Sequence, residues 1–208
     1  MAVEVWLVRH GQTPNNITGE RLYNAPLTAL GRAQAGRLAV ALGDQGVSSV
    51  LSSPLLRAME TGVAIAAASG LPLHVSNDLV EINRWDPYIG ASAAQLRSRF
   101  PGAALERDMP ADGWTYPGPE PDASAQGRIR RVVATVAALP AGSRVALVGH
   151  GTLNGRLLAA WLGAAAREGP VFTQDNACIN HLTIAPGRLT LHRCNDTGHL
   201  AGIEAPPA

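Results

Sequence analysis

The stretch Val5-Trp6-Leu7-Val8-Arg9-His10-Gly11 decides how the chain folds, because a short apolar run ends there abruptly on Arg-His-Gly. The β-branched and aromatic residues of positions 3–8 are typical of a strand that is buried on both faces, as in a parallel sheet. Arg9 and His10 then lie at the carboxyl end of that strand, which is where open α/β sheets bind their ligands. Pro14 cannot continue a strand, so a polar loop is expected after Gly11.

The same pattern recurs far along the chain. Residues 144–148 form a second apolar run, which ends on Gly149-His150-Gly151 before a segment with helical periodicity. The carboxyl ends of parallel strands meet at one edge of a sheet, so His10 and His150 are expected to share a pocket. One histidine at a strand end is as often structural as functional, but two in the same setting favour a functional site.

Strand and helix patterns alternate along the rest of the chain, which predicts an α/β fold with a mostly parallel central sheet. Helices are expected at residues 28–42, from 53 onward, and at 91–100, 122–139 and 153–162; further strands are expected at 47–51, 71–75, 179–184 and 189–194. The last two strands flank Pro186-Gly187 and should form a hairpin. Residues 101–121 hold five of the fifteen prolines, which is typical of a loop or lid.

Arg57 follows a predicted helix start. Ser53 is a favoured N-cap and Pro54 is favoured in the first turn. Arg57 falls in that turn, so its guanidinium can point back toward His10, where the helix N-terminus adds partial positive charge.

Two other groups of charged residues need interpretation. Glu81 lies among apolar neighbours, where a carboxyl group is easier to keep protonated than in water, as a general acid requires. The helix at 122–139 has an apolar stripe, so its arginines are expected on a solvated face; they are Arg128, Arg130 and Arg131.

Length and composition limit the classes of function. A chain of 208 residues with 46% hydrophobic content predicts one domain over residues 1–208, with a lid or loop insertion around residues 84–121. The net charge of +1 and the lack of long charge runs argue against a nucleic-acid partner. All seventeen basic residues are arginines, so any cationic side chain that binds an oxyanion must be a guanidinium.

The N-terminal apolar run is used by the first strand, so no signal peptide and no membrane association are expected, and we predict a cytoplasmic protein. Cys178 and Cys194 lack CxxC spacing and are expected to be reduced, although the sequence alone leaves a disulfide open. The oligomeric state stays open, a homodimer included.

Several ordered motifs together resemble the histidine phosphatase superfamily, also called the phosphoglycerate mutase-like family. In chain order the matching residues are Arg9-His10-Gly11, Thr13, Asn16, Pro26-Leu27-Thr28, Gly31-Arg32-Ala33-Gln34-Ala35, Ser52-Ser53-Pro54-Leu55-Leu56-Arg57-Ala58, Glu81 and His150-Gly151. They span most of the chain. The resemblance implies a single-domain, three-layer α/β/α fold.

Phosphoryl transfer from a monoester needs cationic clamps, an in-line nucleophile and a proton for the leaving group. The resemblance implies that His10 is the nucleophile and forms a phosphohistidine, and that Glu81 is the general acid and then the base. Arg9, Asn16, Arg57, His150 and Gly151 would line the phosphate pocket. This scheme needs no metal and no cofactor. His181, His192 and His199 lack the spacing of zinc ligands and are interpreted as structural.

The sequence determines the substrate, and the group that finally accepts the phosphoryl group, less well than it determines the phosphate pocket. Many members carry a Gly-aromatic-acid-Gly run after the acid, whereas this chain has Arg84-Trp85-Asp86-Pro87-Tyr88-Ile89-Gly90. No role is carried over to Glu120, which stands where the family tends to have a Gly-Gly-Glu-Ser run. Aromatic residues of this region are candidates for a wall beside the leaving group; they are Trp85, Tyr88, Trp114 and Tyr116.

Three functions are therefore compared. The first is a phosphatase that acts on a small phosphomonoester, and the second is a phosphoglycerate mutase. The resemblance implies that mutases of this family have a longer insert between the acid and the second histidine and use lysine as well as arginine. This chain has no lysine and a compact insert, which favours hydrolysis over mutase transfer. The third is a phosphate-binding module without turnover. The presence of all six residues to which the resemblance assigns a part in phosphoryl transfer argues against it; they are Arg9, His10, Asn16, Arg57, Glu81 and His150.

Overall fold

The computed structural model describes residues 2–19, 22–84, 88–106, 109, 113, 115–116, 118–164 and 172–203. Within these residues the main sheet has seven strands. Their spatial order is β5 (Ala103–Leu105), β3 (Leu73–Val75), β2 (Ser49–Ser52), β7 (Arg144–Gly149), β1 (Val3–Arg9), β8 (Ile179–Ala185) and β9 (Arg188–Asp196). The strands from β5 to β1 are parallel, and the β8–β9 hairpin extends the sheet in antiparallel pairing. The predicted α/β fold with a mostly parallel sheet is confirmed.

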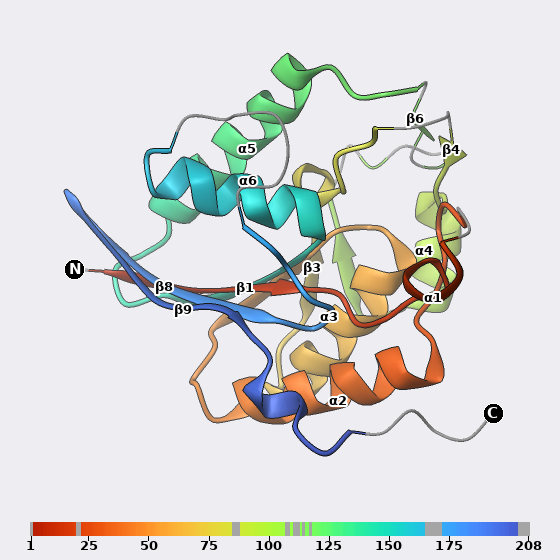
Figure 1. Cartoon of the computed structure of the whole chain (residues 1–208), viewed down its shortest axis with the longest axis horizontal. Helices are drawn as coiled ribbons and strands as arrows, with labels where there is room; N and C mark the ends of the chain where they lie inside the picture. The colour runs from red at the N-terminus through yellow and green to blue at the C-terminus, as the bar shows by residue number, and fades with distance from the viewer. Residues whose placement is uncertain are drawn as a thin grey trace.

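Helices cover both faces of this sheet (Figure 1). One face packs against α2 (Ala29–Gly43) and α3 (Leu56–Ala68), and the other packs against α5 (Asp122–Ala137) and α6 (Gly151–Trp161). On the side of the molecule toward which β1 runs lie α1 (Asn15–Thr18), α4 (Ala93–Arg99) and a small sheet of β4 (Tyr88–Ile89) and β6 (Thr115–Tyr116), as Figure 1 shows. Short 3-10 helices are η1 (Asn77–Leu79) and η2 (Gly198–Leu200).

Strand β1 supplies both cores because its side chains alternate between the two faces. Trp6 and Val8 belong to the core under α2 and α3, whereas Val5 and Leu7 belong to the core under α5 and α6. All four are nearly inaccessible to solvent. Burial on both faces explains why the sequence of β1 is a continuous apolar run and not an alternating pattern.

The register between β1 and β7 brings the two histidines to the same edge. Arg9 pairs with Gly149 in parallel, so the next residues, His10 and His150, leave their strands at the same level. The His10 N–H donates to Gly149 O at 3.2 Å.

Three parts of the sequence prediction need correction. The third helix begins at Leu56 with Leu55 as its N-cap, two residues later than the predicted cap at Ser53. Ser53 lies in the turn before the helix, where its Oγ accepts the Leu55 N–H and also contacts His150 Nε2. The segment 101–121 is not all loop, because it supplies edge strand β5 and strand β6.

The third correction concerns Arg128, which was expected on a solvated face together with Arg130 and Arg131. Arg128 is buried, whereas Arg130 and Arg131 are exposed as predicted. Position 128 lies three residues after buried Ala125 and four before buried Val132, so the helix turns it toward the core.

Cys178 and Cys194 are free thiols. Burial raises the pKa of Cys178 to about 11, so this thiol stays protonated at neutral pH. In the part of the chain that the structure describes, no helix is both long and apolar enough to cross a bilayer.

Candidate active site

His10 and His150 meet at the carboxyl edge of the sheet. Their ring centroids are 5.1 Å apart, and the ring planes are tilted by 58°. Both side chains are buried. The convergence that the paired strand ends predicted is therefore present in the structure.

The hydrogen bonds of His10 define its tautomer. Nδ1 lies 2.7 Å from Gly11 O, an acceptor, so Nδ1 carries the proton. Nε2 accepts a hydrogen bond of 3.1 Å from Nε of Arg57, which is always a donor. The lone pair of Nε2 therefore faces the side from which Arg57 approaches.

Burial holds the pKa of His10 well below its usual value, and the positive charges of Arg57 and Arg9 lower it further. The hydrogen bond to Gly11 acts in the opposite direction but does not outweigh these effects. Burial is also the main reason that the pKa of His150 is lowered, with Arg57 and His10 adding to the effect. Both imidazoles are thus neutral at physiological pH.

His150 is held by a residue that sequence reasoning assigned to another task. Its Nε2 lies 2.8 Å from Ser53 Oγ, and this hydroxyl can serve either tautomer because it donates and accepts. The other ring nitrogen, Nδ1, is buried and has no hydrogen-bond partner among the described residues. Ser53 lies just before α3, and Arg57 lies in the first turn of that helix. The two residues therefore reach the two histidines from the same turn, and their closeness in the sequence was a signal that could have identified Ser53.

Arg9 is held by a hydrogen bond to the segment that precedes β8, far along the chain. Its Nη1 donates to Gln174 O at 2.5 Å, and burial lowers its pKa while nearby Glu81 raises it. A carbon placed at the Cβ position of Gly151 would lie 3.7 Å from Arg9 Nε and 4.0 Å from Glu81 Oε2. Arg9 and Glu81 therefore line the same region beside Gly151.

Glu81 caps helix α6 from outside the helix. Its Oε1 accepts the N–H groups of Ile82 (2.8 Å) and Leu153 (3.0 Å), and its Oε2 accepts the N–H of Thr152 (3.1 Å). Thr152 and Leu153 belong to the first turn of α6, whose N–H groups have no intrahelical acceptor. The half-buried carboxyl group is thus fixed against the helix that follows His150.

Asn16 is oriented by its own loop. Its Oδ1 accepts the N–H and the hydroxyl of Thr13, both at 2.9 Å, and the Nδ2 of Asn176 at 3.2 Å. Because the oxygen is occupied, the amide nitrogen is the atom that remains for a ligand. Asn16 is exposed, so it lies at the mouth of the site.

Sequence reasoning missed the segment 174–178, which holds the site from behind. Asn176 Nδ2 donates to His10 O at 3.3 Å, and the Ala177 N–H donates to the same oxygen at 3.1 Å. Ala177 has a φ of 58°, a left-handed conformation that costs a non-glycine residue about 1 kcal/mol. The segment carried no signal in the sequence because most of these contacts use backbone atoms.

The aromatic wall predicted for the leaving group falls largely outside what the structure describes. Trp85 and Trp114 lie outside the described residues. For Tyr88 and Tyr116 only the backbone is described, and the two residues pair across β4 and β6.

The fold and the site define a class of protein: an α/β domain with two neutral histidines and two arginines at the carboxyl edge of a parallel sheet. Residues 5–197 match the profile described as histidine phosphatase superfamily (branch 1). The chain belongs to this superfamily.

Relatives with a more specific name show how far this similarity reaches. A protein named probable phosphoglycerate mutase GpmB from Yersinia enterocolitica is 33% identical over 169 residues, which is 77% of this chain and 75% of that protein. The structure of a mycobacterial glucosyl-3-phosphoglycerate phosphatase has a TM-score of 0.70 and 28% identity, covering 95% of this chain and all (100%) of that one. The alpha-ribazole phosphatase from Shigella flexneri has a TM-score of 0.71 and 26% identity, covering 97% and 100%. These comparisons support a phosphatase or mutase activity.

Proposed function

We propose that this protein hydrolyses small phosphomonoesters through a phosphohistidine on His10. The observation that carries the proposal is the state of the His10 ring. Its Nδ1 proton is held by Gly11 O, which leaves the Nε2 lone pair beside Arg57 for attack on phosphorus. The lowered pKa of His10 keeps this lone pair available at neutral pH.

In this proposal the phosphoryl oxygens are bound by the groups around His10. Arg9 and Arg57 supply positive charge, Asn16 supplies its amide N–H, and neutral His150 donates from its ring. The hydrogen bond from Arg57 to His10 uses the lone pair that must attack, so a phosphoryl oxygen has to take over the Arg57 N–H first. Substrate binding would thereby release the nucleophile.

Glu81 handles the proton in both half-reactions. The Nε2–P bond forms while the bond from phosphorus to the leaving oxygen breaks, and that oxygen takes a proton from Glu81. Water then attacks phosphorus and gives a proton to the Glu81 carboxylate. The Nε2–P bond breaks, inorganic phosphate is released and His10 is restored. General acid catalysis of this kind contributes about 10²- to 10⁴-fold.

The main alternative is transfer of the phosphoryl group to a second hydroxyl, because relatives include proteins named phosphoglycerate mutase. All basic residues of this chain are arginines. The family resemblance implies that a mutase would use lysine as well as arginine to hold the substrate carboxylate. We therefore place hydrolysis first.

The test is a panel of phosphomonoesters, with release of inorganic phosphate and interconversion of phosphoglycerates measured in parallel. Rapid quenching should trap a phosphoenzyme that is stable in alkali and labile in acid. His10→Ala should abolish both turnover and this intermediate while its circular dichroism matches the parent protein. Retained turnover in His10→Ala would overturn the mechanism. Phosphate or vanadate binding without turnover on any substrate would favour a binding module.

A further inference from the structure

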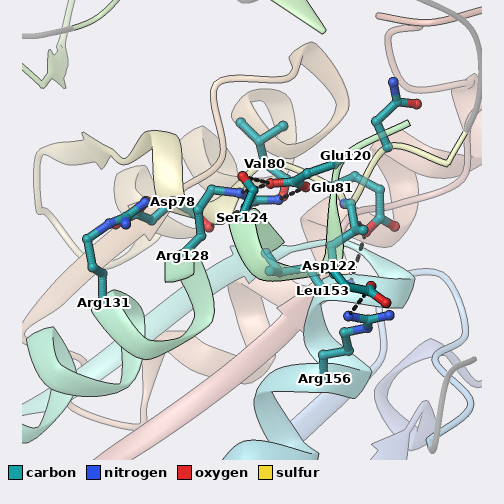
Figure 2. A network of polar contacts seen from close by, with 12 residues as sticks. Asp78, Val80, Glu81, Glu120, Asp122, Ser124, Arg128, Arg131, Leu153 and Arg156 are labelled. Carbon is teal, nitrogen blue, oxygen red and sulfur yellow. Dashed lines mark hydrogen bonds and ion pairs between the residues drawn. The ribbon is translucent and has the colours of Figure 1, made fainter. Parts of the chain in front are cut away.

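Arg128 forms a buried fork that holds four oxygen atoms (Figure 2). Its Nε and Nη2 donate to the two carboxylate oxygens of Glu120, at 2.9 and 2.6 Å. Its Nη1 donates to two backbone carbonyls, Asp78 O and Val80 O, both at 2.8 Å. The side chains of Arg128 and Glu120 are only 7% and 6% exposed.

The two carbonyls belong to the segment that delivers Glu81. Strand β3 ends at Val75, so residues 78–82 are not held by a sheet ladder. Arg128 extends from α5 and hydrogen-bonds this segment at Asp78 and at Val80, the residue directly before Glu81. The carboxyl group of Glu81 is meanwhile held by N–H groups of α6. The backbone and the side chain of Glu81 are therefore fixed by two different helices.

Glu120 and nearby Gly118 form hydrogen bonds with the chain on the other side of Glu81, at Asn83. Its N–H donates to Asn83 O at 2.7 Å, and Asn83 Nδ2 donates to Gly118 O at 2.8 Å. Ser124 adds a hydroxyl hydrogen bond of 3.0 Å to the Glu120 carboxylate. Residues on both sides of Glu81 are thus attached to one ion pair.

Stability alone is a weak reason for such a pair. Burial of two charges costs about as much as their attraction returns, and apolar replacements of similar volume are often as stable. An apolar pair, however, cannot bind the carbonyls of Asp78 and Val80. What the ion pair supplies, beyond stability, is the fixed path of the chain around Glu81.

We propose that Arg128 and Glu120 are positioning residues for Glu81, so that their loss impairs proton transfer to the leaving group. This inference rests on the proposed function, in which Glu81 is the proton donor. It predicts a loss that depends on the leaving group. An alkyl phosphate needs the proton, because an alkoxide is a poor leaving group, whereas p-nitrophenolate leaves readily without it.

The experiment compares kcat/KM for an alkyl phosphate and for p-nitrophenyl phosphate in a double variant, Arg128→Met with Glu120→Leu. Both charges are removed together, so no unpaired charge stays buried and the variant is expected to fold. We expect kcat/KM to fall about 10- to 100-fold for the alkyl phosphate, within the range of general acid catalysis, and less than about threefold for p-nitrophenyl phosphate. Glu81→Gln serves as the reference and should show the same selectivity with a larger loss.

Arg131→Met is the matched control. Arg131 also forms a bidentate pair on this segment, with the carboxylate of Asp78, but it is exposed and binds no carbonyl there. It should leave both substrates unaffected. An equal loss on both substrates in the folded double variant, or no loss on either, would overturn the inference. If the parent protein hydrolyses neither substrate, the proposed function itself fails, which is a distinct result.

Discussion

The Nε of Arg57 lies 3.1 Å from Nε2 of His10 and donates a hydrogen bond to it. Arg57 thus acts on the histidine in two ways. The hydrogen bond fixes the proton on Nδ1, and the positive charge disfavours a second proton on the ring. Arg57 thus contacts Nε2 of His10, the atom to which the proposed function assigns the attack on phosphorus.

Replacement of Arg57 by Gln should raise the pKa of His10 toward its usual value, because a nearby positive charge is removed. The value should stay below normal, since burial is the largest cause of the shift. NMR titration of the imidazole resonances measures both the pKa and the tautomer. We also expect kcat/KM to fall about 10²-fold or more, the usual cost of losing a donor to the transition state.

Arg37→Gln, at an exposed position of α2, is the control and should change neither quantity. An unchanged pKa of His10 in Arg57→Gln would contradict the electrostatic role of Arg57.

The two buried histidines should make stability depend on pH. Their pKa values in the folded state lie well below the usual 6.5, so below about pH 6.5 the unfolded chain binds protons that the folded chain does not. The free energy of unfolding should therefore fall as the pH decreases from 6.5. The limiting slope is about 1.4 kcal/mol per pH unit for each histidine.

Urea unfolding between pH 7 and 5 tests this dependence. His181 and His199, with pKa values also lowered by partial burial, add to the total, so each variant is compared with the parent. His10→Gln and His150→Gln should each reduce the slope by up to about 1.4 kcal/mol per pH unit. If both variants have the same slope as the parent, these histidines take up protons in the folded state as readily as in the unfolded chain, and their pKa values are not lowered.

The sequence predicted the elements that follow from apolar periodicity and the residues that lie at strand ends. Strands β1 and β7 end on His10 and His150, and their parallel pairing was enough to predict a shared pocket. Thr28, where the helix at residues 28–42 was predicted to begin, is the N-cap of α2, and its side chain accepts the Gly31 N–H. These features depend on local patterns, which a sequence displays directly.

The sequence did not reveal contacts that depend on tertiary structure. Arg128 occupies the buried stripe of α5, but its charge predicted a solvent-exposed position. Its burial is compensated by the ion pair with Glu120 and by hydrogen bonds to the carbonyls of Asp78 and Val80. Ser53 was interpreted only as a helix cap. Its contact with His150 joins residues that are 97 positions apart, and a local sequence pattern cannot show such a contact. Position on a helix face was the better guide for Arg128 than residue type.

Asn176 should be important for activity although it follows no motif. Its Nδ2 bridges His10 O and Asn16 Oδ1, so it holds both the loop that carries His10, the proposed nucleophile, and the amide of Asn16. Asn176→Ala should lower kcat/KM about 10-fold, equivalent to about 1.4 kcal/mol. Asn176→Asp should be worse, because a carboxylate oxygen would face two acceptor oxygens.

Asn15→Ala is the control for Asn176. The Asn15 side chain donates to Leu22 O in the same region and, among the residues that the structure describes, forms no hydrogen bond with His10 or Asn16. We therefore expect a change below about twofold. Equal activity of Asn176→Asp and Asn15→Ala would remove the positioning role.

The loop after His10 packs against α2 through two glycines, and this contact should tolerate no side chain. A Cβ on Gly31 would lie 2.0 Å from Gln12 O, and a Cβ on Gly11 would lie 2.4 Å from Gly31 O. Both clashes are with backbone, so relief requires a shift of the loop that carries His10. Gly31→Ala should destabilise the fold by about 1 to 3 kcal/mol, the usual cost of overpacking, and reduce kcat/KM.

Gly36→Ala tests the same substitution in the same helix without the contact. A Cβ on Gly36 meets no atom within 4 Å, so alanine should stabilise the helix by about 0.5 to 1 kcal/mol. Thermal unfolding of the two variants should therefore shift the midpoint in opposite directions. Equal shifts would mean that the approach of Gln12 to Gly31 does not constrain the loop, and with it the position of His10.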